Sequence, residues 1–149
     1  MQTAEVVARG SVMHEDTLLA ELDSGAVNTM LPDQARQYLP WELERAQLHS
    51  RFHYRPLAGE SFMDLERRVR QFLLTLALRK VEGTIGVVTH DRWMQMLVKN
   101  ALGWSVRDFQ EWRKSFDMFP NACVLVFEHL GADTVRFLEE ESSATPNLK

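Results

Sequence analysis

The chain has 149 residues, of which 45% are hydrophobic and 26% are charged, with a formal net charge of -4. This composition is typical of one globular domain of roughly 100–200 residues. The acidic balance argues against a nucleic-acid-binding protein, and the single cysteine argues against a disulfide-stapled secreted scaffold. No apolar run approaches the ~18 residues of a membrane span. We therefore expect a cytoplasmic protein with a single domain over residues 1–141 and a disordered polar tail over residues 142–149.

The first third of the chain predicts short elements separated by prolines. Gln2–Ala8 is compatible with a helix, and the apolar run Thr17–Leu22 predicts a strand. Pro32 stands where a helix can begin, because proline is tolerated in the first turn. By the same rule a second helix is predicted over Pro40–Phe52, and the Pro- and Gly-containing stretch His53–Gly59 predicts a loop.

An amphipathic helix over Ser61–Val81 is the clearest prediction. Its apolar stripe recurs at helical spacing and comprises Leu65, Val69, Phe72, Leu73 and Leu76. Ser61 and Asp64 resemble a capping box at its start. Three arginines lie mostly off this stripe and are interpreted as a solvated helix face: Arg67, Arg68 and Arg70.

The second half of the chain predicts alternating strands and helices. Thr84–Thr89 is apolar and rich in β-branched residues, which predicts a strand buried on both faces. The remaining predicted elements are helices over Trp93–Leu102 and Val106–Phe116 and a hairpin of strands over Ala122–Phe127 and Thr134–Leu138. This order of elements indicates an α/β sandwich.

His90 is the first candidate functional residue, because it follows the predicted strand Thr84–Thr89. In open α/β sheets, ligands bind beyond the carboxyl ends of the strands. The helix that follows His90 offers free amide groups to an anion, and an imidazole donates hydrogen bonds to phosphate. The alternative, that His90 only caps that helix, stays open.

Glu60 is the second candidate, because it is the last loop residue before the helix over Ser61–Val81. A carboxylate held by a glycine turn at a cleft can act as a general acid. The alternative, which physics alone favours, is that the helix dipole stabilises the charge of Glu60. His49 and His53 are four residues apart and form a weaker metal-site candidate, because no third ligand has suitable spacing.

Five segments, in chain order, resemble sequence blocks of the histidine phosphatase superfamily, also called phosphoglycerate-mutase-like. They are Gln2–Val7 ("QTA-E-I"), Leu19–Gly25 ("L-x-E-x-x-x-G"), Arg55–Val69 ("RxxGGES…D…RV"), Val87–His90 ("VTH") and Asn121–Val124 ("N-x-S-V"). The resemblance extends to about Leu138 and implies the three-layer α/β sandwich of the phosphoglycerate-mutase-like fold.

The resemblance also implies a chemistry. In the family, a histidine of an N-terminal Arg-His-Gly motif attacks a phosphoryl group, and a second histidine, here His90, stabilises the group in transfer. A glutamate, here Glu60, gives a proton to the leaving oxygen. No metal or other cofactor is needed, and the expected partner is a small phosphorylated metabolite, not nucleic acid or a membrane. The further residues expected to bind phosphate or substrate are Arg55, Asp91, Arg92 and Asn121.

The sequence departs from the family pattern in two places. No Arg-His-Gly motif is present, so we expect an N-terminally truncated form that lacks the first central strand and its nucleophile. Asp91 stands where the family often has glycine, and its charge would repel phosphate unless it is turned away or paired with Arg92. Two hypotheses follow: a phosphatase or phosphomutase domain with little activity as it stands, or a non-catalytic binding or assembly module. An exposed sheet edge would favour a homodimer.

Overall fold

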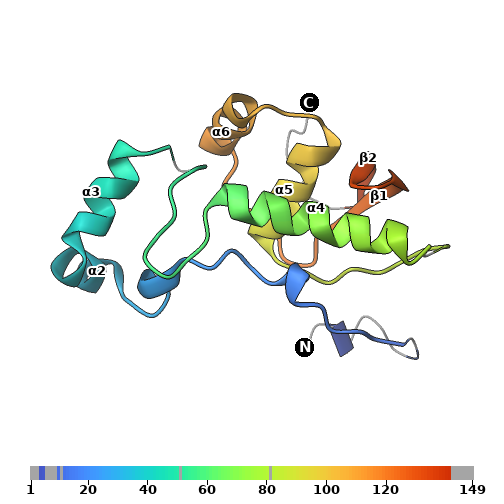
Figure 1. Ribbon diagram of the computed structural model, residues 1–149, viewed down its shortest axis with the longest axis horizontal. Coiled ribbons are helices and arrows are strands. Elements are labelled where there is room, and N and C mark those ends of the chain that lie inside the picture. The colour runs from blue at the N-terminus through green and yellow to red at the C-terminus, as the bar shows by residue number, and fades with distance from the viewer. Residues whose placement is uncertain (1–3, 6–9, 11, 51, 81, 142–149) are drawn as a thin grey trace.

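The computed structural model describes residues 4–5, 10, 12–50, 52–80 and 82–141 (Figure 1). Within these residues the elements are the 3₁₀ helices η1 (Thr17–Leu19) and η2 (Gly25–Val27), the α-helices α2 (Pro32–Tyr38), α3 (Pro40–Leu48), α4 (Phe62–Leu78), α5 (Asp91–Ala101) and α6 (Val106–Ser115), and the strands β1 (Val124–Gly131) and β2 (Thr134–Glu141). The predicted tail over residues 142–149 and most of the predicted helix Gln2–Ala8 lie outside the described residues.

Helix α4 is the central element, and it begins as the sequence predicts. The Ser61 hydroxyl accepts a hydrogen bond from the Asp64 amide at 3.2 Å, and Asp64 Oδ2 accepts one from the Ser61 amide at 3.0 Å. This confirms the capping box, which satisfies two amides that the helix itself leaves free. The helix ends at Leu78, three residues before the predicted end, and Lys80 has the positive φ of 49° that is common where a helix stops.

The hydrophobic core lies between α4 and α5, which pack against each other in the middle of the molecule (Figure 1). The Phe72 and Trp93 rings meet edge to face, with their centroids 5.6 Å apart. The predicted apolar stripe of α4 supplies four buried members of this core. The buried cluster comprises Phe52, Phe62, Leu65, Val69, Phe72, Leu73, Trp93, Met96, Phe109 and Val135.

The sheet consists of the antiparallel hairpin β1–β2, which confirms the predicted hairpin. Two residues, Ala132 and Asp133, connect the strands, and the backbone has positive φ at Gly131 (103°), the last residue of β1, and at Ala132 (49°). Strand β1 contacts α4 and strand β2 contacts α5, so the hairpin packs against both central helices. Helices and hairpin together confirm the α/β class.

The other two predicted strands do not form. Thr17–Leu22 contains the 3₁₀ helix η1 followed by extended chain, and Thr84–Thr89 belongs to no ladder. Ile85, Val87 and Val88 are about 40% exposed, at 43%, 39% and 39%. The prediction is wrong because apolar, β-branched residues form a strand only beside another strand, and none of the described residues supplies one here.

Helices α2 and α3 begin at Pro32 and Pro40, as predicted, and lie apart from the helix pair α4–α5 (Figure 1). Helix α3 ends at Leu48, earlier than the predicted Phe52. Glu42 attaches this unit to the loop before α4, because its carboxylate accepts hydrogen bonds from the Tyr54 hydroxyl and, at 3.3 Å, from the Leu57 amide. Burial and the Glu42 carboxylate raise the pKa of Tyr54 to about 12.

Candidate functional site

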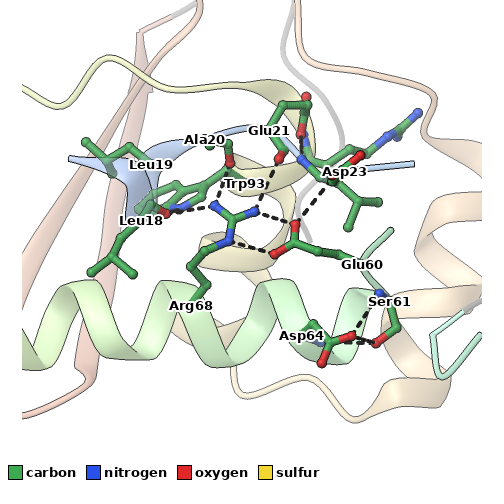
Figure 2. A network of polar contacts seen from close by, with 12 residues as sticks. Leu18, Leu19, Ala20, Glu21, Asp23, Glu60, Ser61, Asp64, Arg68 and Trp93 are labelled. Carbon is green, nitrogen blue, oxygen red and sulfur yellow. Dashed lines mark hydrogen bonds and ion pairs between the residues drawn. The ribbon is translucent and has the colours of Figure 1, made fainter. Parts of the chain in front are cut away.

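The segment Leu18–Asp23 lies beside α4 and is attached to α5 by Trp93 (Figure 2) and to the chain just before α5 by Thr89. The Thr89 hydroxyl donates to the carbonyl oxygen of Leu19 at 2.7 Å. The indole Nε1–H of Trp93, which is almost fully buried, donates to the carbonyl oxygen of Leu18 at 2.8 Å. The start of α5 and this segment are therefore held together without a β-ladder.

Arg68 attaches the same segment to α4 (Figure 2). Its guanidinium donates to three carbonyl oxygens of the segment, those of Leu18 at 2.9 Å, Ala20 at 2.6 Å and Glu21 at 3.2 Å. The side chain of Arg68 is only 14% exposed, so its assignment to a solvated face is wrong, whereas that of Arg67 is 69% exposed. The carbonyl groups that bury Arg68 come from a part of the chain about 50 residues earlier, which helical periodicity does not detect.

Glu60 pairs with Arg68 in a groove of about 320 Å³ between α4 and the segment. Arg68 Nε lies 3.0 Å from Glu60 Oε1, and Nη2 lies 2.7 Å from Oε2. The Asp23 amide also donates to Oε2, at 3.2 Å. Both oxygens of the predicted general acid are therefore already engaged by the protein. Arg55 lines the same groove.

His90 is exposed and stands at the N-cap of α5. Its carbonyl oxygen accepts the first hydrogen bond of the helix, from Met94 at 3.0 Å, but its ring makes no capping hydrogen bond. His90 therefore does not use its imidazole to cap α5, and the residue stands at the N-terminus of that helix, where an anion is favoured.

Glu21 is a residue that sequence reasoning missed as a functional candidate. Its Oε2 accepts a hydrogen bond from the backbone amide of Arg92 at 3.4 Å, while Oε1 accepts one from Leu22 at 2.7 Å. A half-buried carboxylate thus lies at the first turn of α5, two residues beyond His90. Glu21 is the last residue but one of the predicted strand Thr17–Leu22, so the rule that ligands bind near the carboxyl ends of strands could have pointed to it. No hydrogen bond among the described residues links Glu60 to this turn.

The Asp91 carboxylate is paired within the protein. Its Oδ1 accepts from the Phe119 amide at 2.9 Å, and its Oδ2 accepts from Gln95 at 2.7 Å and lies 3.3 Å from Arg92 Nη1. Arg92 also donates to the carbonyl oxygen of Asp117 at 3.2 Å. The negative charge of Asp91 is therefore compensated within the protein.

The other two predicted substrate contacts, Arg55 and Asn121, make no hydrogen bond to this turn among the described residues. Arg55 Nε donates to Asp64 Oδ2 at 2.9 Å, which places Arg55 at the start of α4. Burial raises the pKa of Asp64, but the hydrogen bonds from Arg55 and Ser61 outweigh it and lower that pKa to about 2. Asn121 is exposed in the turn before β1. None of the hydrogen bonds of the described residues connects either side chain to His90.

The described residues contain no group of three or more His, Cys, Asp or Glu side chains that could hold a metal. Among these residues, His49 and His53 are therefore not joined by a third metal ligand. No helix in the described part of the chain is long and apolar enough to cross a membrane.

Comparison with known proteins identifies the family. The sequence profile of the histidine phosphatase superfamily (branch 1) matches residues 1–137. The chain belongs to this superfamily. This member of the histidine phosphatase superfamily is 33% identical, over 72 residues, to a probable fructose-2,6-bisphosphatase of Schizosaccharomyces pombe. That match covers 48% of this chain and 17% of the yeast protein.

A solved structure shows the same fold. The crystal structure of the alpha-ribazole phosphatase from Shigella flexneri is similar with a TM-score of 0.73 and 18% sequence identity. The similarity covers 91% of this chain and 65% of the Shigella chain, so this member of the superfamily spans less than two thirds of the length of either relative. The phosphoglycerate-mutase-like fold expected from the resemblance is confirmed.

Proposed function

We propose that this chain is a phosphoryl-transfer domain acting on a small phosphorylated metabolite, with His90, Glu21 and the first turn of α5 at the reacting centre. The observation that carries the proposal is the hydrogen bond from the Arg92 amide to Glu21 Oε2 at 3.4 Å. It brings a carboxylate to the helix N-terminus where His90 is exposed. The names of both relatives denote phosphatases, which supports a phosphorylated small molecule as substrate.

Each group has a role that its position supports. The ring of His90 and the amides of α5 donate hydrogen bonds to the phosphoryl oxygens, whose charge spreads outward during transfer. A carboxylic acid beside that group gives its proton to the leaving oxygen and then takes one from the attacking water. Phosphate groups are bound at helix N-termini for the same electrostatic reason.

The geometry favours Glu21 over Glu60 for the acid–base role. Glu60 already accepts two hydrogen bonds from Arg68 and one from the Asp23 amide, so no oxygen is left without a protein partner. Glu21 Oε1 accepts a hydrogen bond from the Leu22 amide at 2.7 Å, but the contact of Oε2 with the Arg92 amide is longer, at 3.4 Å, and therefore weaker. A substrate oxygen can replace that contact at small cost. Glu60 then acts on the reaction only through the residues that it holds.

The nucleophile is proposed to come from outside this sequence. The five histidines of the sequence are His14, His49, His53, His90 and His129, and none of them stands in an Arg-His-Gly motif. In the family that motif supplies the histidine that takes the phosphoryl group. We therefore expect little or no turnover from the chain alone, and restored turnover when a segment carrying the motif is supplied on the same chain or on another.

The test is hydrolysis of p-nitrophenyl phosphate by the chain alone and by the chain joined to an Arg-His-Gly segment. Glu21→Gln in the joined protein is expected to lower kcat by about 100-fold, since general acid catalysis contributes roughly 10²–10⁴. His90→Asn is expected to lower it by a similar factor. The matched control is Glu44→Gln, a carboxylate on the exposed side of α3.

Two results would contradict the proposal. One is turnover by the chain alone that survives His90→Ala, because catalysis would then not need the residue placed at the reacting centre. The other is a Glu21→Gln variant with the kcat of the wild type, because the acid would then be another group, with Glu60 the next candidate.

A second function, a non-catalytic assembly module, is favoured by the exposed segment Thr84–Val88. No backbone hydrogen bond joins this segment to any other described residue, and three of its apolar side chains are about 40% exposed. Unpaired extended chain of this kind pairs readily with a second strand, and a homodimer is the simplest product. Sedimentation velocity tests this assembly function. Val87→Lys is expected to dissociate the dimer, whereas Val12→Lys is expected to leave it intact. A wild-type protein that stays monomeric at high concentration would exclude the homodimer.

A further inference from the structure

We propose that Arg68 is a positioning residue, which together with Glu60 fixes the segment Leu18–Asp23 so that Glu21 faces the first turn of α5. The inference rests on the proposed function for the importance of Glu21. It assigns to the half-buried Arg68–Glu60 pair a task in the reaction, although neither side chain is hydrogen-bonded to the proposed reacting centre.

Every N–H group of the Arg68 guanidinium donates a hydrogen bond. Nε donates to Glu60 Oε1, Nη1 donates to the carbonyl oxygens of Leu18 and Ala20, and Nη2 donates to that of Glu21 and to Glu60 Oε2. Five bonds thus use the five N–H groups in their fixed planar arrangement. A lysine has three donors on one atom and cannot reproduce this pattern.

Glu60 completes the attachment on the far side of Glu21. Its Oε2 accepts from the Asp23 amide at 3.2 Å, and its own amide donates to the Asp23 carbonyl oxygen at 2.7 Å. The backbone is therefore held at Leu18, Ala20 and Glu21 by Arg68 and at Asp23 by Glu60 (Figure 2). Arg68 and Glu60 also hold each other, so the two attachments move together.

These contacts matter because the segment has no β-ladder to hold it. Only the short 3₁₀ helix η1 gives it regular structure. Trp93 of α5 attaches it at Leu18, and Thr89, just before α5, attaches it at Leu19. Beyond Leu19, the backbone that carries Glu21 is fixed by Arg68 and Glu60. A displacement of about 1 Å at a reacting group can cost about 100-fold in rate, so the attachment is expected to act on kcat.

The test compares Arg68→Lys with Arg67→Lys, its neighbour on α4, which is exposed. The first readout is the NMR signal of the Arg92 amide, which donates to Glu21 Oε2, with Glu21→Gln as the reference for loss of that contact. Arg68→Lys is expected to move the Arg92 signal in the same direction as Glu21→Gln does, and Arg67→Lys to leave it in place. Glu60→Gln, which preserves the shape of the side chain, is the second variant if Arg68→Lys does not fold.

The second readout is turnover of p-nitrophenyl phosphate by the protein joined to an Arg-His-Gly segment. Arg68→Lys is expected to lower kcat about 10-fold or more at a temperature where it is fully folded, with KM changed less than about twofold. A stabilising role alone would lower the unfolding temperature without moving kcat per folded molecule. If the Arg92 signal stays unchanged in Arg68→Lys and in Glu60→Gln, the inference is overturned. If the signal moves but Glu21→Gln retains full turnover, Arg68 still positions Glu21 and it is the proposed function that fails.

Discussion

The guanidinium of Arg68 and the carboxylate of Glu60 form a bidentate ion pair, with Nε 3.0 Å from Oε1 and Nη2 2.7 Å from Oε2. The two side chains are only 14% and 27% exposed. A parallel pair of charge-assisted bonds of this kind fixes direction as well as distance. The loop residue before α4 and the second turn of that helix are thereby joined, and the segment that carries Glu21 is joined to both.

Removing one partner of this pair is expected to destabilise the fold. Glu60→Ala leaves the Arg68 charge largely shielded from water and without its carboxylate, and we expect the free energy of unfolding to fall by about 2–3 kcal/mol. The measurement is urea unfolding of both proteins. The control is Asp33→Ala, whose pair with Arg36 is 92% and 70% exposed and is expected to contribute less than about 0.5 kcal/mol. Equal losses in the two variants would contradict the burial argument.

A methyl group at Gly25 is expected to disrupt the turn that follows the segment. Gly25 has a φ of 63°, and a Cβ there would lie 2.2 Å from the Leu57 carbonyl oxygen. We expect Gly25→Ala to cost about 2–4 kcal/mol of unfolding free energy, because backbone atoms have to separate. Gly86→Ala is the control, since a Cβ there meets nothing within 4 Å and the change is expected to stay within about 1 kcal/mol. Thermal or urea unfolding of the two variants distinguishes them.

Acid is expected to weaken the start of α4 through Asp64. The pKa of Asp64 in the folded protein is about 2, below its ordinary 3.8. The folded state therefore favours the ionised form, and the resulting stability is fully present above about pH 5 and is lost as the pH falls toward 2. Because Arg55 is exposed, we expect about 1–2 kcal/mol from this source.

The check on Asp64 is urea unfolding of the wild type and Asp64→Asn at several pH values between 7 and 2.5. The asparagine variant is expected to be less stable at pH 7 and to approach the wild type as the pH falls. A constant difference across this range would show that the carboxylate charge at position 64 does not contribute.

The apolar stripe of α4 is expected to provide much of the stability of the helix pair. Leu65 is fully buried in the core cluster, and Leu65→Ala is expected to cost about 2–5 kcal/mol because it loses apolar contact and leaves a cavity. Leu78, on the same helix, is 75% exposed, and Leu78→Ala is expected to change the unfolding free energy by less than about 0.5 kcal/mol. Comparable losses would mean that the stripe does not face the core.

Local patterns predicted the helices and the hairpin well. The Ser61 cap, the stripe that includes Leu65 and Val69, and the prolines that begin α2 and α3 each act within a few residues along the chain. Such short-range effects can be read from the sequence alone. The family could be identified in the same way, because five segments in order resembled one set of sequence blocks, and the profile match over residues 1–137 confirms it.

The sequence by itself therefore determined the helix boundaries to within a few residues, the α/β class, the family and the position of His90 at the start of a helix. Only the tertiary structure decided that Thr84–Thr89 forms no strand, that Arg68 is largely shielded rather than solvated, and that Glu21 rather than Glu60 reaches the first turn of α5. The physical reason is common to all three. A strand needs a neighbouring strand, and a buried charge needs acceptors, here carbonyl groups 47 to 50 residues away along the chain. Local periodicity carries no information about such partners.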